Sequence, residues 1–418
     1  MIIQRPFYLN QLIASQANRM IKIITGLRRC GKSFLLFELF SNHLISNGVK
    51  EDHIIKIDLE DRRNASLCDP DKLIEHIDNL MADHEMYYIL LDEVQKVKDF
   101  VDVLNSYLKV KNADVYATGS NSRFLSKDVV TEFRGRGQDI HMYPLSFAEY
   151  YNAVGGDRSL RYRDYSTYGG LPQVILLGDD KARKDYLAHL NHSVYLTDVV
   201  ERYKIRHREE LEELLKTLAS SIGSPCNPHK LSNTFKSKKN VTISPATISK
   251  YLSYFCDAFL VEKAMRYDVK GKKYINTLSK YYFTDIGLRN AMLGFRQNEP
   301  THIMENIIFN TLLMHGFSVD VGIVEQVGKN DDGSSVRKQF EVDFVVNDAD
   351  RRYYIQSAYA IPDEEKMRQE TNSFRHIADG FKRIIIVRDD IIPYYNDEGI
   401  LIVGLLDFLI NPAVINQT

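Results

Sequence analysis

Residues 26–33 read Gly26-Leu27-Arg28-Arg29-Cys30-Gly31-Lys32-Ser33, and they match the pattern G-x-x-x-x-G-K-[ST]. The stretch lies between a strand-like segment, Ile21 to Thr25, and a helix-like segment, Phe34 to Phe40. In that setting glycines let backbone N–H groups turn toward phosphates, and the helix N-terminus favours negative charge. We therefore predict a phosphate loop in which Lys32 reaches the β- and γ-phosphates of a nucleotide and Ser33 offers its hydroxyl to Mg²⁺. The alternative is a chance match in a glycine-containing turn.

The composition describes an ordinary globular protein. At 418 residues the chain is long enough for about three domains. Its net charge of −2 gives no overall signal for nucleic acid, so any basic site must be local. The four cysteines lie far apart without C-x-x-C spacing, which argues against a zinc site or a disulfide framework. A reducing cytoplasm fits this pattern, and no apolar run has the length of a membrane span.

A second element of the expected site follows the helical stretch 71–84. Residues 87–93 read Tyr-Tyr-Ile-Leu-Leu-Asp-Glu, which is an apolar strand that ends in two acids. Behind a phosphate loop, this pattern predicts that Asp92 holds Mg²⁺, directly or through water, and that Glu93 orients the attacking water. The alternative is that the two acids begin a solvated loop.

Two further segments suggest catalytic side chains. The strand-like Val115 to Thr118 leads into Ser120 and Asn121, which could sense the γ-phosphate or position water, because ligands gather at the carboxyl ends of parallel strands. Arg134 and Arg136 then lie in a glycine-containing loop, and either one could stabilise charge on a neighbouring subunit's phosphate within a homo-oligomer. Ordinary surface turns are the alternative for both segments.

Taken in order, these motifs resemble those of the prokaryotic AAA+-type P-loop ATPases that carry a C-terminal DUF4143 region. The resemblance covers nearly the whole chain and implies a RecA-like parallel sheet with a helical lid, together with ATP and Mg²⁺ as cofactors. The segments that carry it are Gly26–Ser33, Ile89–Glu93, Thr118–Ser122, Arg134–Arg136, Pro144–Tyr150 and Tyr168–Pro172.

The middle of the chain favours a winged helix-turn-helix. Residues 183–222 carry helical patterning, typical of lid or connecting helices. Residues 242–252 then place Ser244 as a possible N-cap and Pro245 at the first helical position. Strand-like segments around a turn at 268–273 follow, as a β-wing would.

This middle region is also locally basic. Residues 225–285 contain eleven Lys or Arg and four Asp or Glu, whereas the whole chain is slightly acidic. The excess suggests contact with DNA phosphates and little base specificity, although winged helices also dock proteins or serve as structural modules. The candidate DNA contacts are Lys236, Lys238, Lys239, Lys250, Lys270, Lys272 and Lys273.

The C-terminal region has a helix-like segment with Glu305, followed by strand-like segments at 341–346 and 353–358. This order resembles a PD-(D/E)XK nuclease core, in which a helix acid, a strand Asp and an E-x-K triplet surround Mg²⁺. Glu305 and Asp343 match that pattern, but Gln356 stands where Glu is expected and Ala358 where Lys is expected. An amide oxygen can still bind a hard cation, whereas alanine cannot replace lysine. We therefore expect a nuclease-like fold that is kept for structure or DNA binding.

These observations predict an α/β chain with four parts: an AAA+-type ATPase core (1–150), a helical lid (151–222), a winged helix (223–297) and a nuclease-like domain (298–418). The expected function is ATP hydrolysis coupled to a DNA-associated task. Two alternatives stay open, namely a slow ATP-dependent switch that binds a protein partner and a metal-dependent nuclease.

Overall fold

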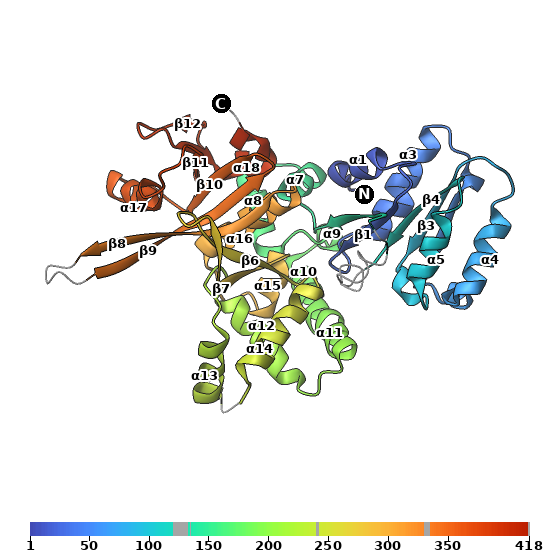
Figure 1. Cartoon of the computed structure of the whole chain (residues 1–418), viewed down its shortest axis with the longest axis horizontal. Coiled ribbons are helices and arrows are strands. Elements are labelled where there is room, and N and C mark those ends of the chain that lie inside the picture. The colour runs from blue at the N-terminus through green and yellow to red at the C-terminus, as the bar shows by residue number, and fades with distance from the viewer. Residues whose placement is uncertain (120–132, 134, 240–241, 330–334, 417–418) are drawn as a thin grey trace. The chain divides into compact units, whose positions relative to one another are not determined.

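The computed structural model describes residues 1–119, 133, 135–239, 242–329 and 335–416 (Figure 1). The chain divides into two compact units, one formed by Met1–Pro144 with Asp257–Phe259 and the other by Leu145–Cys256 with Leu260–Thr418. Each unit contains a sheet of its own. Among the residues described, no helix has both the length and the apolar character needed to cross a lipid bilayer.

The first unit is built on five parallel strands in the order β2-β3-β4-β1-β5. The strands are β1 (Ile21–Gly26), β2 (Ile54–Asp58), β3 (Tyr87–Asp92), β4 (Ala113–Thr118) and β5 (Gly137–Met142). The helical segments are α1 (Pro6–Ala14), α2 (Lys32–Phe34), η1 (Leu35–Phe40), α3 (Ser41–Ser46), η2 (Glu51–His53), η3 (Arg62–Cys68), α4 (Pro70–Leu80), η4 (Val94–Lys96) and α5 (Phe100–Tyr107). This parallel sheet fits the expected RecA-like core, with β4 inserted between β1 and β3.

Both faces of this sheet are covered, which explains why its strands read as nearly continuous apolar runs. Helices α4 and α5 cover one face, where Leu73 and Leu104 belong to the same buried cluster as Ile57 and Leu91 of the strands. On the other face the ring of Phe40 packs against that of Tyr116, with centroids 4.6 Å apart. The sheet is therefore a rigid platform for the loops at its carboxyl edge.

The second unit contains eight strands in the order β12-β13-β11-β10-β9-β8-β6-β7. They are β6 (Val261–Asp268), β7 (Lys273–Phe283), β8 (Ser318–Lys329), β9 (Ser335–Asp348), β10 (Arg351–Ala358), β11 (Lys382–Val387), β12 (Tyr394–Tyr395) and β13 (Leu401–Gly404). The helical segments are α7 (Phe147–Val154), α8 (Arg158–Tyr168), α9 (Pro172–Leu176), α10 (Asp180–His189), η6 (Leu190–Tyr195), α11 (Leu196–Tyr203), α12 (Arg208–Ser220), α13 (Pro228–Lys239), α14 (Pro245–Asp257), α15 (Ile286–Met292), α16 (Pro300–Met314), α17 (Glu364–Arg375), α18 (Leu405–Ile410) and η7 (Pro412–Asn416).

The hairpin β6–β7, where the sequence indicates a wing, is part of this larger sheet. Strand β6 pairs in parallel with β8 through Arg266 and Val321, Tyr267 and Gly322, and Asp268 and Ile323. One hydrogen-bonded sheet thus includes strands from both the predicted winged helix and the predicted nuclease-like domain. The sheet is continuous across the division at residue 297, so that division remains a proposal about sequence modules.

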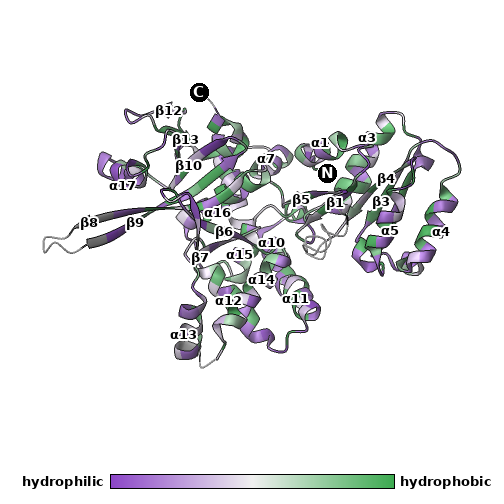
Figure 2. Cartoon of the chain, viewed as in Figure 1, coloured by the Kyte–Doolittle hydropathy of each residue, from purple (hydrophilic) through white to green (hydrophobic). Residues whose placement is uncertain are grey.

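Helices cover the two faces of the mixed sheet. On one face α16 places Phe309 against Tyr282 of β7, with ring centroids 4.2 Å apart. On the other face α17 contributes Phe374 to a core that includes Val345 and Ile385. Figure 2 shows α17 as largely hydrophilic, and the helix accordingly buries only Thr371, Ser373 and Phe374.

The segment Tyr168–Pro172 has a packing role in the second unit. The backbone N–H of Gly170 donates to the buried carboxylate of Asp285 at 2.7 Å, and the same carboxylate caps α15 through the N–H of Leu288 at 3.0 Å. Gly169 adopts φ +76°, and a Cβ there would lie 2.2 Å from an Asp285 oxygen. Glycine is therefore required at residue 169 by both its backbone angle and the closeness of this carboxylate.

We predict that Gly169→Ala lowers the free energy of unfolding by about 2–4 kcal/mol, because it combines a left-handed backbone with a steric clash. Gly178→Ala is the matched control, since a Cβ at Gly178 meets no atom within 4 Å, and it should change stability by less than about 0.5 kcal/mol. Urea denaturation followed by circular dichroism measures both. Equal stability of the two variants would contradict the packing role of Gly169.

Candidate functional site

The predicted phosphate loop follows β1 and turns on two glycines. Gly26 has φ +138° and Gly31 has φ +104°, both in the region that side chains disfavour. A Cβ on Gly26 would lie 2.0 Å from the carbonyl oxygen of Met142 on the neighbouring strand β5. The first glycine is thus fixed by sheet packing, and Gly31 lets the backbone enter α2.

Lys32 is held inside this loop. Its side chain is buried, and its Nζ donates to the carbonyl oxygens of Gly26 at 3.0 Å and Leu27 at 3.1 Å. These are weak acceptors compared with phosphate oxygens, to which a lysine ammonium makes charge-assisted hydrogen bonds. The ammonium is therefore placed at the loop, where a bound phosphate would compete for it.

Ser33 and Asp92, the two predicted Mg²⁺ ligands, lie in contact. The Ser33 hydroxyl donates to Asp92 Oδ2 at 2.7 Å, and the Thr118 hydroxyl donates to Asp92 Oδ1. Burial raises the pKa of the Asp92 carboxyl above its ordinary value, although the hydrogen bonds from Thr118 and Ser33 oppose the shift. A hydroxyl and a carboxylate are oxygen ligands of the kind that Mg²⁺ prefers, so the pair fits that ion.

Glu93 directly follows the end of β3 and is oriented by its backbone. It adopts φ +53°, which is uncommon for a residue with a side chain, and its N–H donates to the Thr118 hydroxyl at 3.0 Å. Its carboxylate accepts a hydrogen bond from Gln95. Thr118 therefore contacts both acids, a role that the sequence analysis missed because it looked only beyond the end of β4.

A neutral histidine lies behind the loop. Thr25 contacts His141 Nδ1 at 3.0 Å through its hydroxyl, and the same hydroxyl contacts Asp139 at 3.0 Å. Burial lowers the pKa of His141 to about 4, and the nearby charge of Lys32 acts in the same direction. At neutral pH His141 is therefore uncharged, and Lys32 supplies the positive charge.

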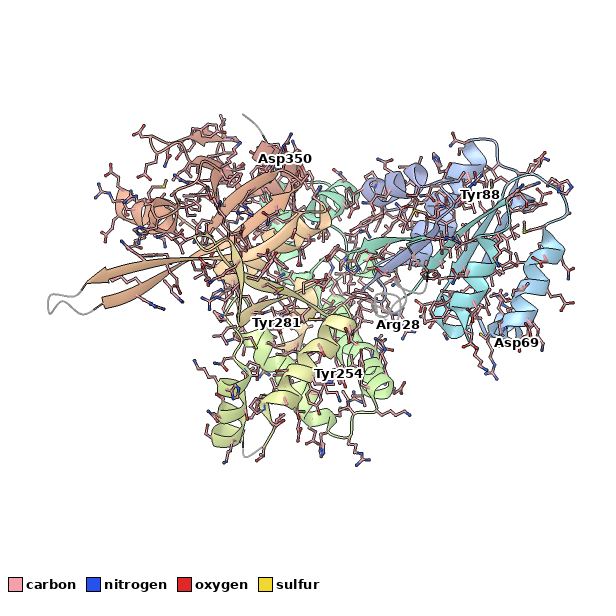
Figure 3. The ribbon with its side chains drawn as sticks, in the orientation of Figure 1. Arg28, Asp69, Tyr88, Tyr254, Tyr281 and Asp350 are labelled. Carbon is pink, nitrogen blue, oxygen red and sulfur yellow. The ribbon has the colours of Figure 1, made fainter. Side chains whose placement is uncertain are left out.

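The loop also has an exposed arginine. Arg28, which is labelled in Figure 3, pairs at 2.5 Å with Glu60, a residue just beyond the end of β2. Two other predicted loop residues have different surroundings: Arg29 adopts a left-handed backbone with φ +66°, and Cys30 is fully buried. An exposed ion pair contributes little to stability, so Arg28 can exchange Glu60 for another anion at small cost.

The predicted catalytic residues beyond β4 are placed only in part. Ser120, Asn121 and Arg134 lie outside the described residues. Arg136 is exposed, and its carbonyl oxygen accepts from the N–H of Ile21, the first residue of β1. Because β5 runs parallel to β1, Arg136 lies at the amino edge of the sheet, and the structure does not bring it together with the loop of its own chain.

Two of the predicted nuclease-like residues of the second unit, Asp343 and Gln356, lie in contact. Gln356 Oε1 accepts a long hydrogen bond of 3.4 Å from the N–H of Asp343, whose carboxylate accepts from the N–H of Ser357 at 2.8 Å. Glu305 lies in the same cluster, whereas Ala358 is buried without a polar group. Burial and the nearby Glu305 charge raise the pKa of Asp343 well above its ordinary value.

Sequence reasoning missed two members of this cluster. The Nζ of Lys280, from β7, lies 3.0 Å from Glu305 and 2.7 Å from Glu341. Although burial opposes it, the Lys280 charge lowers the pKa of Glu305, aided by the hydrogen bond from the Tyr282 hydroxyl and by His302, whose Nδ1 lies 3.7 Å away. Glu341 could have been found, because it lies two residues before Asp343 on one strand and so shares its face.

The proposed DNA-contact lysines lie on α13, α14 and the β6–β7 turn. Ser244 accepts from the N–H of Thr247 at 3.1 Å, which confirms it as the N-cap of α14, and Tyr254 of the same helix is labelled in Figure 3. The side chains of Lys238 and Lys239 lie outside the described part. The other five candidates are exposed, namely Lys236, Lys250, Lys270, Lys272 and Lys273.

We predict that Thr118→Val, which keeps the side-chain shape but removes the hydroxyl, lowers the free energy of unfolding by about 1–3 kcal/mol. The change leaves the buried N–H of Glu93 without its acceptor and removes a donor from Asp92. Thr118→Ser retains the hydroxyl and should lose much less. Chemical denaturation compares the two, and a valine variant as stable as the serine variant would exclude the bridging role.

Two segments of the chain match known protein families. Residues 18–151 match a family described as an AAA domain. Residues 159–299 match a domain of unknown function, DUF8612, in place of the expected DUF4143 region, which is not shown. The helical lid, winged helix and nuclease-like domain are not resolved by these matches.

Similarity to solved structures is distant. The Aeropyrum pernix ORC1 protein, solved in complex with DNA, is 13% identical with a TM-score of 0.29, over 70% of this chain and 93% of that chain. A DNA polymerase III gamma subunit-related protein from Thermotoga maritima is 14% identical with a TM-score of 0.29, over 60% and 81%. At these scores the likeness carries no argument about function.

Two curated relatives match over most of their length. An uncharacterized protein of Haemophilus influenzae is 34% identical over 98% of this chain and 99% of its own length. The uncharacterized protein MJ1544 of Methanocaldococcus jannaschii is 30% identical over 91% of this chain and 83% of its own length. The chain therefore belongs to the same protein family as these two relatives, and its residues 18–151 form an AAA domain.

Proposed function

We propose that this protein hydrolyses ATP in the presence of Mg²⁺ and uses the reaction in a DNA-associated task. The observation that carries the ATPase proposal is the 2.7 Å contact between Ser33 and Asp92, next to a lysine held within the same phosphate loop. A chance sequence match would not bring a hydroxyl, a buried carboxylate and an ammonium together at the carboxyl edge of a parallel sheet.

Each residue has a distinct part in the proposed reaction. Lys32 exchanges the carbonyl oxygens of Gly26 and Leu27 for the β- and γ-phosphates. Ser33 and Asp92 hold Mg²⁺, which neutralises charge on the phosphate oxygens when it is bound. Glu93, which directly follows the end of β3, accepts a hydrogen bond from the attacking water and orients it.

We predict that Lys32→Ala lowers the rate of ATP hydrolysis at least about a hundredfold, because it removes a charged donor to the transferred phosphate. Glu93→Gln should also abolish most turnover but leave ATP binding, since it changes only the group that orients water. Phosphate release measures hydrolysis, and fluorescence of a labelled nucleotide measures binding.

Lys50→Ala is the matched control for Lys32→Ala. Lys50 is exposed and pairs with Glu85 at the surface, so its loss should leave hydrolysis unchanged. If Lys32→Ala hydrolysed ATP as fast as Lys50→Ala, the phosphate loop would not be the catalytic site.

The DNA part of the proposal is supported by the local charge of the second unit. Lys270, Lys272 and Lys273 are exposed around the β6–β7 turn, and Lys250 is exposed on α14, the helix that precedes β6 in the chain. Exposed lysines of this kind contact phosphates and set affinity without reading bases. Lys280 also belongs to the basic stretch, but its burial removes it from any such surface.

We predict that replacing Lys270, Lys272 and Lys273 together by alanine weakens DNA binding and reduces the slope of log K against log salt by about 2 to 3, because each phosphate contact releases about one counterion. Fluorescence anisotropy with duplex and single-stranded DNA, at several salt concentrations and with or without ATP, measures the effect.

A charge-matched triple variant provides the control. Lys98, Lys109 and Lys111 are exposed in the first unit, and their replacement by alanine should leave both affinity and slope unchanged. Equal losses in the two triple variants would show that binding is non-specific attraction to net charge. Absence of salt-sensitive binding to any DNA would end the DNA proposal.

A further inference from the structure

A cluster of charged side chains in the second unit has no part in the proposed ATPase site. Lys280 comes from β7, Glu305 from α16, and both Glu341 and Asp343 from β9. The side chains of Lys280 and Glu305 are only 4% and 9% exposed. Removing such groups from water is costly unless opposite charges and hydrogen bonds compensate them, so the contacts within the cluster must provide that compensation.

The ammonium of Lys280 contacts both Glu305 and Glu341. Its Nζ lies 3.0 Å from Glu305 Oε1 and 2.7 Å from Glu341 Oε1. The hydroxyl of Tyr282 donates to the same Glu305 oxygen at 2.6 Å. The charge of Lys280 therefore joins a helix and two strands that are far apart in the sequence.

This position of Lys280 conflicts with a metal ion held by the same acids. A divalent cation would need carboxylate oxygens at about 2.0–2.4 Å, and any ion bound by both Glu305 and Glu341 would lie directly beside the ammonium. Like charges at that separation repel each other strongly. Because the Lys280 side chain is almost wholly buried, moving the ammonium aside would require its neighbours to move as well.

The spacing of the acids also argues against a bound metal ion in the native cluster. Among the described residues, the group of three metal-ligating side chains that converge on a common point is His53, Asp83 and Glu85 in the first unit. The acids around Lys280 do not converge in that way. Glu305 and Glu341 each place an oxygen on the ammonium, and Ala358, where the sequence pattern expects a lysine, has no charge to offer them.

We propose that Lys280 is the resident cation of this cluster, and that Glu305, Glu341 and Asp343 bind a divalent metal ion only when the charge of Lys280 is removed. The native cluster is thus a structural lock that fastens β7 to α16 and β9. It also closes the route to metal-dependent nuclease chemistry at this point. The inference does not depend on ATP hydrolysis.

Mn²⁺ binding to the full chain without nucleotide tests the proposal, because Mn²⁺ favours carboxylate ligands and is detected directly by electron paramagnetic resonance. Lys280→Met removes the charge while keeping much of the side-chain length. It should gain a Mn²⁺ site at least about tenfold tighter than any that the wild type shows at this cluster. The added site should disappear in the double variant Lys280→Met/Asp343→Asn.

Lys280→Arg is the matched control, since it retains a positive charge and should gain no site. Any Mn²⁺ bound near the phosphate loop is bound by every variant, so it does not affect the difference between them. Mn²⁺ should also raise the unfolding temperature of Lys280→Met but not that of Lys280→Arg, because a ligand stabilises the folded state that binds it.

Asp343→Asn in an otherwise wild-type chain keeps the test decisive even if Lys280→Met does not fold. The proposal requires that this change leaves Mn²⁺ binding of the wild type unaltered. Loss of a Mn²⁺ site from the wild type on Asp343→Asn would overturn it, since the metal and Lys280 would then coexist. A folded Lys280→Met that gains no site would overturn it equally.

Discussion

Parallel pairing of β1, β4 and β3 brings three strand ends to one edge of a sheet, and the contacts of the phosphate-loop site depend on that pairing. Ser33 follows β1 and Asp92 ends β3, yet these strands are not neighbours. Thr118, at the end of the intervening β4, contacts Asp92 and the N–H of Glu93. Because a shift of one residue in β4 would turn its side chain to the opposite face, the register of this middle strand positions both acids.

The second unit also buries charged side chains, and there the opposite charges lie within the protein. Lys280 and Glu305 are buried and compensate each other, and the partly exposed Glu341 adds a second carboxylate to the same ammonium. At the phosphate loop, by contrast, the partners of Lys32 among the described residues are the backbone carbonyls of Gly26 and Leu27. Lys280 is thus paired with carboxylates, whereas Lys32 holds weaker acceptors that an anion can replace. That difference supports placing the chemistry of this chain at the phosphate loop.

The sequence predicted those features that are local in the chain. The phosphate loop, the acids after β3 and the cap at Ser244 each need only a short pattern with a known physical cause. Arg136 was harder, because its distance from the loop follows from the direction and pairing of β5, which no short pattern contains. Lys280 was missed for a related reason, since its partners lie 25 and 61 residues further along the chain, and only the packing of α16 and the pairing of the strands bring them to it.

The family match that ends at residue 299 does not end at a structural boundary. The matched segment 159–299 contains both Gly170 and Asp285, whose hydrogen bond fastens α8 to the segment that follows β7. It does not contain the acids that contact Lys280. The hairpin β6–β7 therefore needs α16 and β9 to compensate its buried lysine, and it needs β8 to continue its sheet. A chain cut at residue 299 would expose an unpaired strand edge and an uncompensated charge, so the structural unit extends beyond the sequence match.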